Sequence, residues 1–242
     1  MSEYQYYEFL AVDRPLDAAA QAEVRALSTR AEITADSFVN EYQWGDFRGD
    51  PSELVERHYD AHLYLADWGY RRVMLRVPRT ALDLDATEPY LVDDLVVAWT
   101  TDEHLVLDLS NEDEPGDWDH DPEGSLAEIV GVRTELATGD HRALYLAWLA
   151  AYGTWERDED AFDRAADDEV EPPVPPGLGT LTAPQRALAD FLRLDDDLLA
   201  VAAEQSPPLR RTRDKTAPIT TVPPRRTVGA ILDAAARKRA EG

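Results

Sequence analysis

The chain contains no cysteine, and this absence excludes several kinds of chemistry. Without thiols it forms no disulfide, holds no thiolate-bound metal and has no cysteine nucleophile. Long apolar runs are also missing, because no window approaches the roughly twenty residues that span a bilayer. The first residues, MSEYQYYEF, lack the basic and apolar regions of a secretory signal. We therefore expect a cytoplasmic protein with no membrane association.

Several catalytic signatures are missing as well. The sequence has no phosphate-binding G-x-x-x-x-G-K-[ST], no G-x-G-x-x-G after a strand and no G-x-S-x-G elbow. These absences favour a non-enzymatic protein, although they leave catalysis by other means open.

Basic residues are scarce, and their placement is uneven. The 242 residues include 49 acidic and 24 basic side chains, which gives a net charge of −25. From residue 209 to the end, nine basic and three acidic residues give +6, so the rest of the chain carries −31. An acidic body of this kind repels nucleic acid and anionic membranes and favours solubility.

Periodicity and turn residues predict an α+β fold in which helices pack on a mixed β-sheet. We expect strands at residues 4–12, 33–44 and 71–77 and a hairpin at 95–109. Helices are expected at 17–28, 51–68, 126–138, 141–155, 182–194, 196–204 and 227–240. The opening order of elements suggests a ferredoxin-like start, with one strand fewer than that arrangement needs.

Composition divides the chain into four parts. Residues 1–156 form the α+β body, and 157–180 form an acidic, proline-rich linker. Residues 181–205 form a short helical segment, and 206–242 form a basic, largely disordered tail that ends in an amphipathic helix. The apolar stripe of that helix is a candidate docking surface for a partner: Val228, Ile231 and Leu232.

The stretch FVNEYQWGDFRGDPSEL, residues 38–54, combines turn residues with aromatic side chains. Its glycines reverse the chain, and Asp50 is a helix N-cap followed by proline at the first helical position. The Arg-Gly-Asp triplet is therefore a loop and a cap rather than an adhesion motif. Four side chains remain to be explained, either as a lid over the core or as an exposed binding platform: Tyr42, Trp44, Phe47 and Arg48.

Two histidines four residues apart suggest a second kind of site. On the helix expected at 51–68, His58 and His62 lie within one apolar stripe, which is the spacing of helical zinc sites. Glu8 of the first strand could supply a third ligand, and the metal would be zinc or manganese. However, Tyr59 stands where the zinc-protease motif H-E-x-x-H has its glutamate. Ordinary core histidines fit the same pattern, and no cofactor is then needed.

An acidic loop at residues 117–128 approaches a calcium-binding pattern. Acidic residues occupy four loop positions that usually hold ligands: Asp117, Asp119, Asp121 and Glu128. Pro122 stands where the sharp turn needs glycine, and Ser125 with Glu128 forms a capping box for the next helix. We expect a solvated loop with at most weak cation binding.

The first eighty or so residues carry a resemblance. The stretches YQYYEFLAVDRPL, RALSTRAEIT, FVNEYQWGDFRGDP and YDAHLYLADWG are similar to a group of uncharacterised bacterial proteins of actinobacterial type. This resemblance implies a bacterial source and no particular activity.

Two functions follow from these observations. The first is a non-enzymatic, cytoplasmic interaction module, in which an acidic body presents a protein-binding surface and a basic tail docks on that body or on a partner protein. The alternative is a metal-dependent hydrolase centred on His58, His62 and Glu8, where the metal polarises a bound water. Nucleic-acid binding through the tail is disfavoured, because the body repels phosphates.

Overall fold

The computed structural model describes residues 4–112, 122–157, 168–209 and 224–241. Its centre is a seven-stranded sheet with the order β2-β3-β1-β4-β5-β7-β6. The strands are β1 (Gln5–Leu10), β2 (Glu32–Ile33), β3 (Ser37–Tyr42), β4 (Ala61–Ala66), β5 (Tyr70–Pro78), β6 (Val96–Thr100) and β7 (His104–Glu112). The α+β class is confirmed. Each of these strand pairs is antiparallel, so the sheet is not mixed as predicted.

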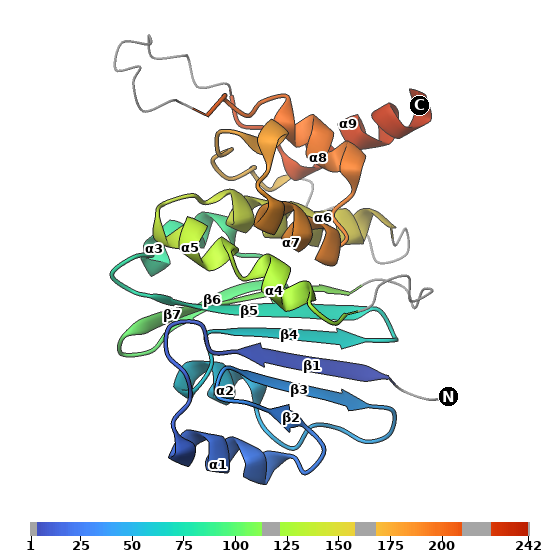
Figure 1. The fold of residues 1–242 in the computed structure, drawn as a ribbon. Helices are drawn as coiled ribbons and strands as arrows, with labels where there is room; N and C mark the ends of the chain where they lie inside the picture. The colour runs from blue at the N-terminus through green and yellow to red at the C-terminus, as the bar shows by residue number, and fades with distance from the viewer. Residues whose placement is uncertain (1–3, 113–121, 158–167, 210–223, 242) are drawn as a thin grey trace.

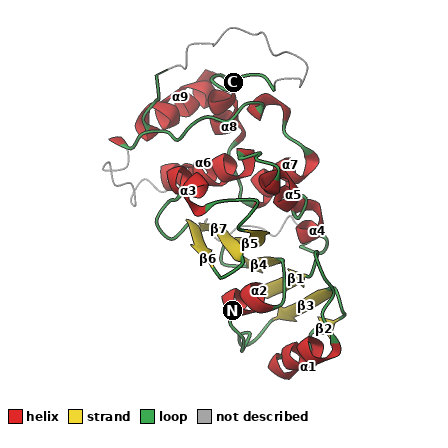
Figure 2. Ribbon diagram, turned by 90° about the vertical axis from the view of Figure 1, so that its left-hand side faces the viewer, coloured by secondary structure: helices red, strands yellow, loops and turns green. Residues whose placement is uncertain are grey.

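The helices lie on both faces of this sheet (Figures 1 and 2). One face bears α1 (Ala18–Leu27) and α2 (Pro51–Arg57), which pack on Phe9, Phe38 and Met74. The other face is covered by α4 (Ser125–Ile129), α5 (Val132–Ala137), α6 (Arg142–Arg157) and α7 (Ala183–Phe191). Beyond them lie α8 (Asp196–Ala203) and α9 (Val228–Glu241). Short turns complete the set: α3 (Leu84–Thr87), η1 (Glu88–Tyr90) and η3 (Leu178–Thr180).

Four predictions about the elements are wrong, and the first is the single helix expected at 126–138, which is divided into α4 and α5. Residues 33–44 form two strands, β2 and β3, rather than one. The helix expected at 51–68 ends at Arg57, and the chain continues as strand β4. β1 is flanked on both sides by antiparallel neighbours, β3 and β4, so the start is not ferredoxin-like.

The end of α2 is fixed by contacts that are distant in sequence. The Asp60 amide donates to the Leu10 carbonyl oxygen (2.8 Å), and its carboxylate accepts the amides of Val12 and Asp13 (2.7 and 2.8 Å). Arg76 also donates to this carboxylate (2.7 Å). These bonds hold residue 60 at the exit of β1, so the chain enters the gap between β1 and β5 as a strand buried on both faces.

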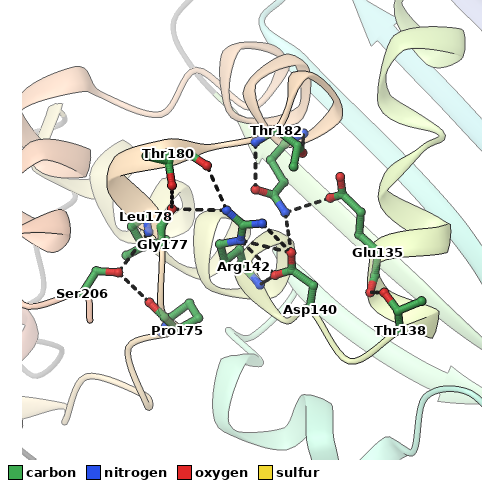
Figure 3. Close-up of polar contacts among 11 residues, drawn as sticks. Glu135, Thr138, Asp140, Arg142, Pro175, Gly177, Leu178, Thr180, Thr182 and Ser206 are labelled. Atoms are coloured by element: carbon green, nitrogen blue, oxygen red, sulfur yellow. Dashed lines mark hydrogen bonds and ion pairs between the residues drawn. The ribbon is translucent and has the colours of Figure 1, made fainter. Parts of the chain in front are cut away.

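A buried polar cluster attaches the later helices to the earlier ones (Figure 3). The Arg142 guanidinium donates to the Asp140 carboxylate (2.6 Å) and to the carbonyl oxygens of Gly177 and Thr180 (3.2 and 3.0 Å). Gln185 donates to the same Asp140 carboxylate (3.0 Å), which joins α7 to the start of α6. Residues 177–180 are therefore fixed to the body, although composition predicted that they belonged to a linker.

The terminal helix also belongs to the body. Val228, Ile231, Leu232 and Ala235 are all buried and lie in the same core cluster as the sheet and α6. Just before them, Arg226 forms an ion pair with the buried Glu171 (2.8 Å). The amphipathic helix expected at 227–240 is thus present as α9, and its apolar stripe packs in the core of the body.

Candidate functional site

The loop between β3 and α2, residues 43–50, is held from below by a buried glutamine. The Gln5 side-chain nitrogen donates to the Asp46 carboxylate (2.9 Å) and to the Gly45 carbonyl oxygen (3.4 Å). The Gln5 side-chain oxygen accepts the hydroxyls of Tyr7 and Tyr64 (2.8 and 2.9 Å). Because the hydroxyls fix the orientation of the amide, its nitrogen can only point toward the loop. This role of Gln5 was not predicted, because from the sequence Gln5 looks like an ordinary polar residue at the start of a strand.

An aromatic anchor fixes the other half of this loop. Phe47 is buried, with its ring centroid 5.4 Å from Tyr7 and 5.5 Å from Phe38. Gly49 passes so close that a Cβ atom there would lie 2.6 Å from the Phe47 ring. Asp50 then accepts the Ser52 amide (2.8 Å) and caps α2 as predicted.

The four aromatic and basic residues of the predicted platform separate into two groups. Phe47 is a lid over the core, and Tyr42 is half-buried with an edge-to-face contact to Tyr7 (5.7 Å). Trp44 and Arg48 are exposed, and Trp44 leaves 72% of its surface to solvent. Trp44 is the most exposed of the large hydrophobic side chains among the described residues.

The predicted metal-binding residues do not come together. His58 is the C-cap of α2, whereas His62 lies within strand β4, so the two do not share a helix face. The His62 ring stacks on Phe9 at a centroid distance of 4.0 Å. Glu8 precedes Phe9 in the same strand, so its side chain points to the opposite face of the sheet. The shared site of His58, His62 and Glu8 is therefore wrong.

Each of these three residues has local partners instead. His62 Nδ1 lies 2.9 Å from the Glu8 carbonyl oxygen and must be protonated, because a carbonyl only accepts. Complete burial lowers the His62 pKa to about 3, which keeps the ring neutral. Burial raises the pKa of the Glu8 carboxyl, although the Tyr6 hydroxyl donates to it (3.1 Å). His58 faces Glu23 of α1 at 3.5 Å.

The weak cation loop cannot be placed. Asp117, Asp119 and Asp121 lie outside the described residues. Glu128 falls in the first turn of α4, whose N-cap is Gly124 and has no side-chain cap bond, so the predicted Ser125 cap is wrong. Within the part of the chain that the structure describes, no group of three or more His, Asp or Glu side chains is arranged to hold a metal ion.

The candidate docking stripe of the terminal helix is not free. Val228, Ile231 and Leu232 face the core, and the exposed part of α9 is its basic end with Arg237 and Lys238. In the described ranges, no helix combines the length and apolar character required to cross a bilayer.

A scan against protein-family models, a search of curated proteins and a search of solved structures each give no match to this chain. The resemblance to uncharacterised bacterial proteins therefore stays a prediction.

Proposed function

We propose that this chain is a non-enzymatic protein-interaction module that binds a partner protein through the loop carrying Trp44. The observation that carries the proposal is the exposure of this indole on a loop that is fixed at Gln5, Phe47 and Asp50. Tryptophan is among the residues most enriched at the centres of protein interfaces, where burial of its large ring contributes much of the affinity. Because the loop is already ordered, binding would cost little additional conformational entropy.

The charge of the chain favours a particular type of partner. A net charge of −25 attracts a basic protein surface over distances of about a Debye length and accelerates the encounter. Lysine or arginine side chains of such a partner could also stack on the Trp44 ring. The same charge favours a cytoplasmic role away from nucleic acid and anionic membranes.

The C-terminal tail is not part of the proposed binding surface. Its apolar stripe is occupied by the core, so that stripe is not offered to a partner. The basic end of α9, with Arg237 and Lys238 exposed, would repel a basic partner, so we assign it no contact with that partner.

The test compares two exposed tryptophans. A tagged chain is purified from the cells that naturally express it, as wild type, Trp44→Ala and Trp68→Ala, and the co-purifying proteins are quantified by mass spectrometry. Trp68 is 39% exposed in the turn between β4 and β5 and serves as the matched control. We expect Trp44→Ala to lose at least tenfold of one specific partner at an unchanged melting temperature, while Trp68→Ala keeps it. Equal recovery with both variants, or no specific partner in the wild type, would refute the proposal.

A further inference from the structure

A cleft of about 500 Å³ lies at the opposite end of β1 from the Trp44 loop. Residues 13–14 after β1, 56–58 at the end of α2, residue 76 of β5 and the β6–β7 turn at 101–104 line it. Its volume falls in the range of small-molecule sites, roughly 300–1,000 Å³. Since the lining is unusually polar for such a site, the ligand must be recognised by charges and hydrogen bonds. The charges that the protein itself has not neutralised therefore define the ligand.

Two carboxylates of the cleft are already occupied. Asp13 accepts two N–H groups of Arg133 (3.2 and 2.8 Å), and Glu56 accepts the indole N–H of Trp99 (2.6 Å). Arg133 therefore balances the charge of Asp13, whereas the indole N–H is neutral and leaves the negative charge of Glu56 in the cleft.

Two guanidinium groups of the cleft are occupied in the same way. Arg76 donates to the Asp60 carboxylate (3.2 and 2.7 Å) and to the Glu56 carbonyl oxygen (3.0 Å). Arg57 forms an ion pair with Glu23 (2.7 Å). These two cations stabilise the walls of the cleft.

Besides Glu56, three charged groups of the lining remain. Among the described residues, Arg14, Asp102 and Glu103 form no side-chain hydrogen bond or ion pair, and all three are exposed at the mouth of the cleft. Burial lowers the pKa of both His58 and His104, so these rings are neutral near pH 7 and offer hydrogen bonds rather than charge. One positive group on the β1 side thus accompanies two negative groups on the β6–β7 turn and a third, Glu56, at the end of α2.

We propose that this cleft binds a small zwitterion of amino-acid or dipeptide size, whose carboxylate contacts Arg14 and whose ammonium group contacts Asp102 and Glu103. A purely anionic ligand would be repelled by the negative charge of the chain and by these turn carboxylates. A purely cationic ligand would leave Arg14 without a partner. A zwitterion satisfies both ends and has no net charge to be repelled. This inference does not depend on the Trp44 loop.

The first experiment tests binding of the free ligand class. The twenty L-amino acids and glycylglycine are titrated into the ¹⁵N-labelled full chain at pH 7, and chemical shifts are followed by NMR. We expect at least one probe to shift amides of residues 101–104 and residue 14 in a saturable manner. The carboxamide and the N-acetyl derivative of that probe should each bind about fivefold more weakly, because each lacks one charge pair. Absence of saturable shifts at 10 mM, or equal binding by the N-acetyl derivative, would overturn the proposal.

The second experiment locates the charges by variants. Arg14→Gln should weaken the zwitterion about fivefold but leave the affinity of its carboxamide unchanged, since the carboxamide lacks the group that Arg14 contacts. Asp102→Asn combined with Glu103→Gln should show the converse pattern with the N-acetyl derivative. Arg186→Gln, at an exposed position on α7 outside the cleft, is the matched control. If Arg14→Gln and Arg186→Gln behave alike, the ligand does not bind where we propose. Trp44→Ala should leave amino-acid binding intact, which separates this test from that of the interaction surface.

Discussion

His62 should make the protein sensitive to acid, and the size of the effect follows from its burial. Its pKa is about 3 in the folded chain, against about 6.5 for an unperturbed histidine. Between these values the unfolded state binds a proton that the folded state excludes, so the free energy of unfolding falls as the pH falls. Above pH 6.5 the ring is neutral in both states, so the full free energy of unfolding is present. At pH 5 the loss is about 1.5 pH units at 1.36 kcal/mol each, or about 2 kcal/mol.

The assay separates this contribution from the carboxylates that titrate nearby. Urea unfolding is measured at pH 7.5 and pH 5 for wild type, His62→Asn and His58→Asn. Asparagine keeps an N–H donor for the Glu8 carbonyl oxygen but does not titrate, so the wild type should lose about 2 kcal/mol more than His62→Asn between the two pH values. His58→Asn should remove a smaller part of the pH dependence, because Glu23 opposes the effect of burial on the His58 pKa.

A second measurement needs no mutation and protects against a variant that fails to fold. In the wild type, NMR titration of the five histidines should show one ring that remains neutral from pH 8 down to pH 4.5. If all five rings titrate with midpoints near 6 or above, His62 is accessible to protons in the folded chain and the reasoning fails. Equal pH dependence of wild type and His62→Asn would refute it as well.

Three further changes test the fold. Asp50→Ala removes the α2 cap and should cost about 1 kcal/mol, which lowers the melting temperature by roughly 2–4 °C; an unchanged midpoint would mean that the cap does not hold this helix. Arg142→Ala leaves the partner carboxylate and two carbonyl oxygens without their donor and should cost roughly 3–5 kcal/mol by urea unfolding, with Arg142→Lys restoring only part; full rescue by lysine would contradict the forked geometry. Ile231→Ala should cost roughly 2–4 kcal/mol by thermal or urea unfolding, and a loss below about 0.5 kcal/mol would mean that α9 is only an appendage.

The sequence predicted those elements whose contacts are local. The β6–β7 hairpin follows from two short apolar runs on either side of a short polar turn. Likewise, Asp17 and Asp50 identify helix starts, because an N-cap bond reaches only two or three residues along the chain. Thr182 with Gln185 forms the predicted capping box of α7 for the same reason.

The failure at residues 51–68 has a physical cause. His58 and His62 fit a helical period of four, but residues 61–66 fit a period of two equally well, since all of them are apolar or aromatic apart from His62 itself. The choice is made by Asp60, whose amide and carboxylate are bound by the exit of β1 almost fifty residues earlier in the chain. This contact cannot be predicted from a local sequence pattern. Because it makes residues 61–66 a strand, His58 and His62 do not share a helix face, and the predicted metal site does not form.

The predicted aromatic platform also depended on contacts that the local sequence does not contain. The sequence predicted the same role for Trp44 and Phe47, because two aromatic residues in one loop look equivalent before the fold is known. The sheet distinguishes them: Phe47 contacts the rings of Tyr7 in β1 and Phe38 in β3, whereas Trp44 comes before Gly45, whose φ of +80° turns the chain between the two aromatic residues. Which aromatic side chain of this loop is exposed therefore depends on where the strands end. The number of aromatic residues in the loop could not predict that.

The arginines explain why net charge alone was a poor guide to the interior. Five largely shielded guanidinium groups each take a neighbouring carboxylate: Arg72 with Asp108, Arg76 with Asp60, Arg133 with Asp13, Arg142 with Asp140, and Arg226 with Glu171. Four of these five pairs join residues 16 to 120 positions apart, so they connect separate parts of the fold. A planar guanidinium can hold a carboxylate and a backbone carbonyl at the same time, as Arg142 does, and an ammonium group lacks that fork. A charge count treats arginine and lysine alike and places both in solvent. In this chain the buried carboxylates of Asp60 and Glu171 are paired with arginine, so a charge-conserving exchange of Arg142, Arg133 or Arg226 to lysine is a structural change.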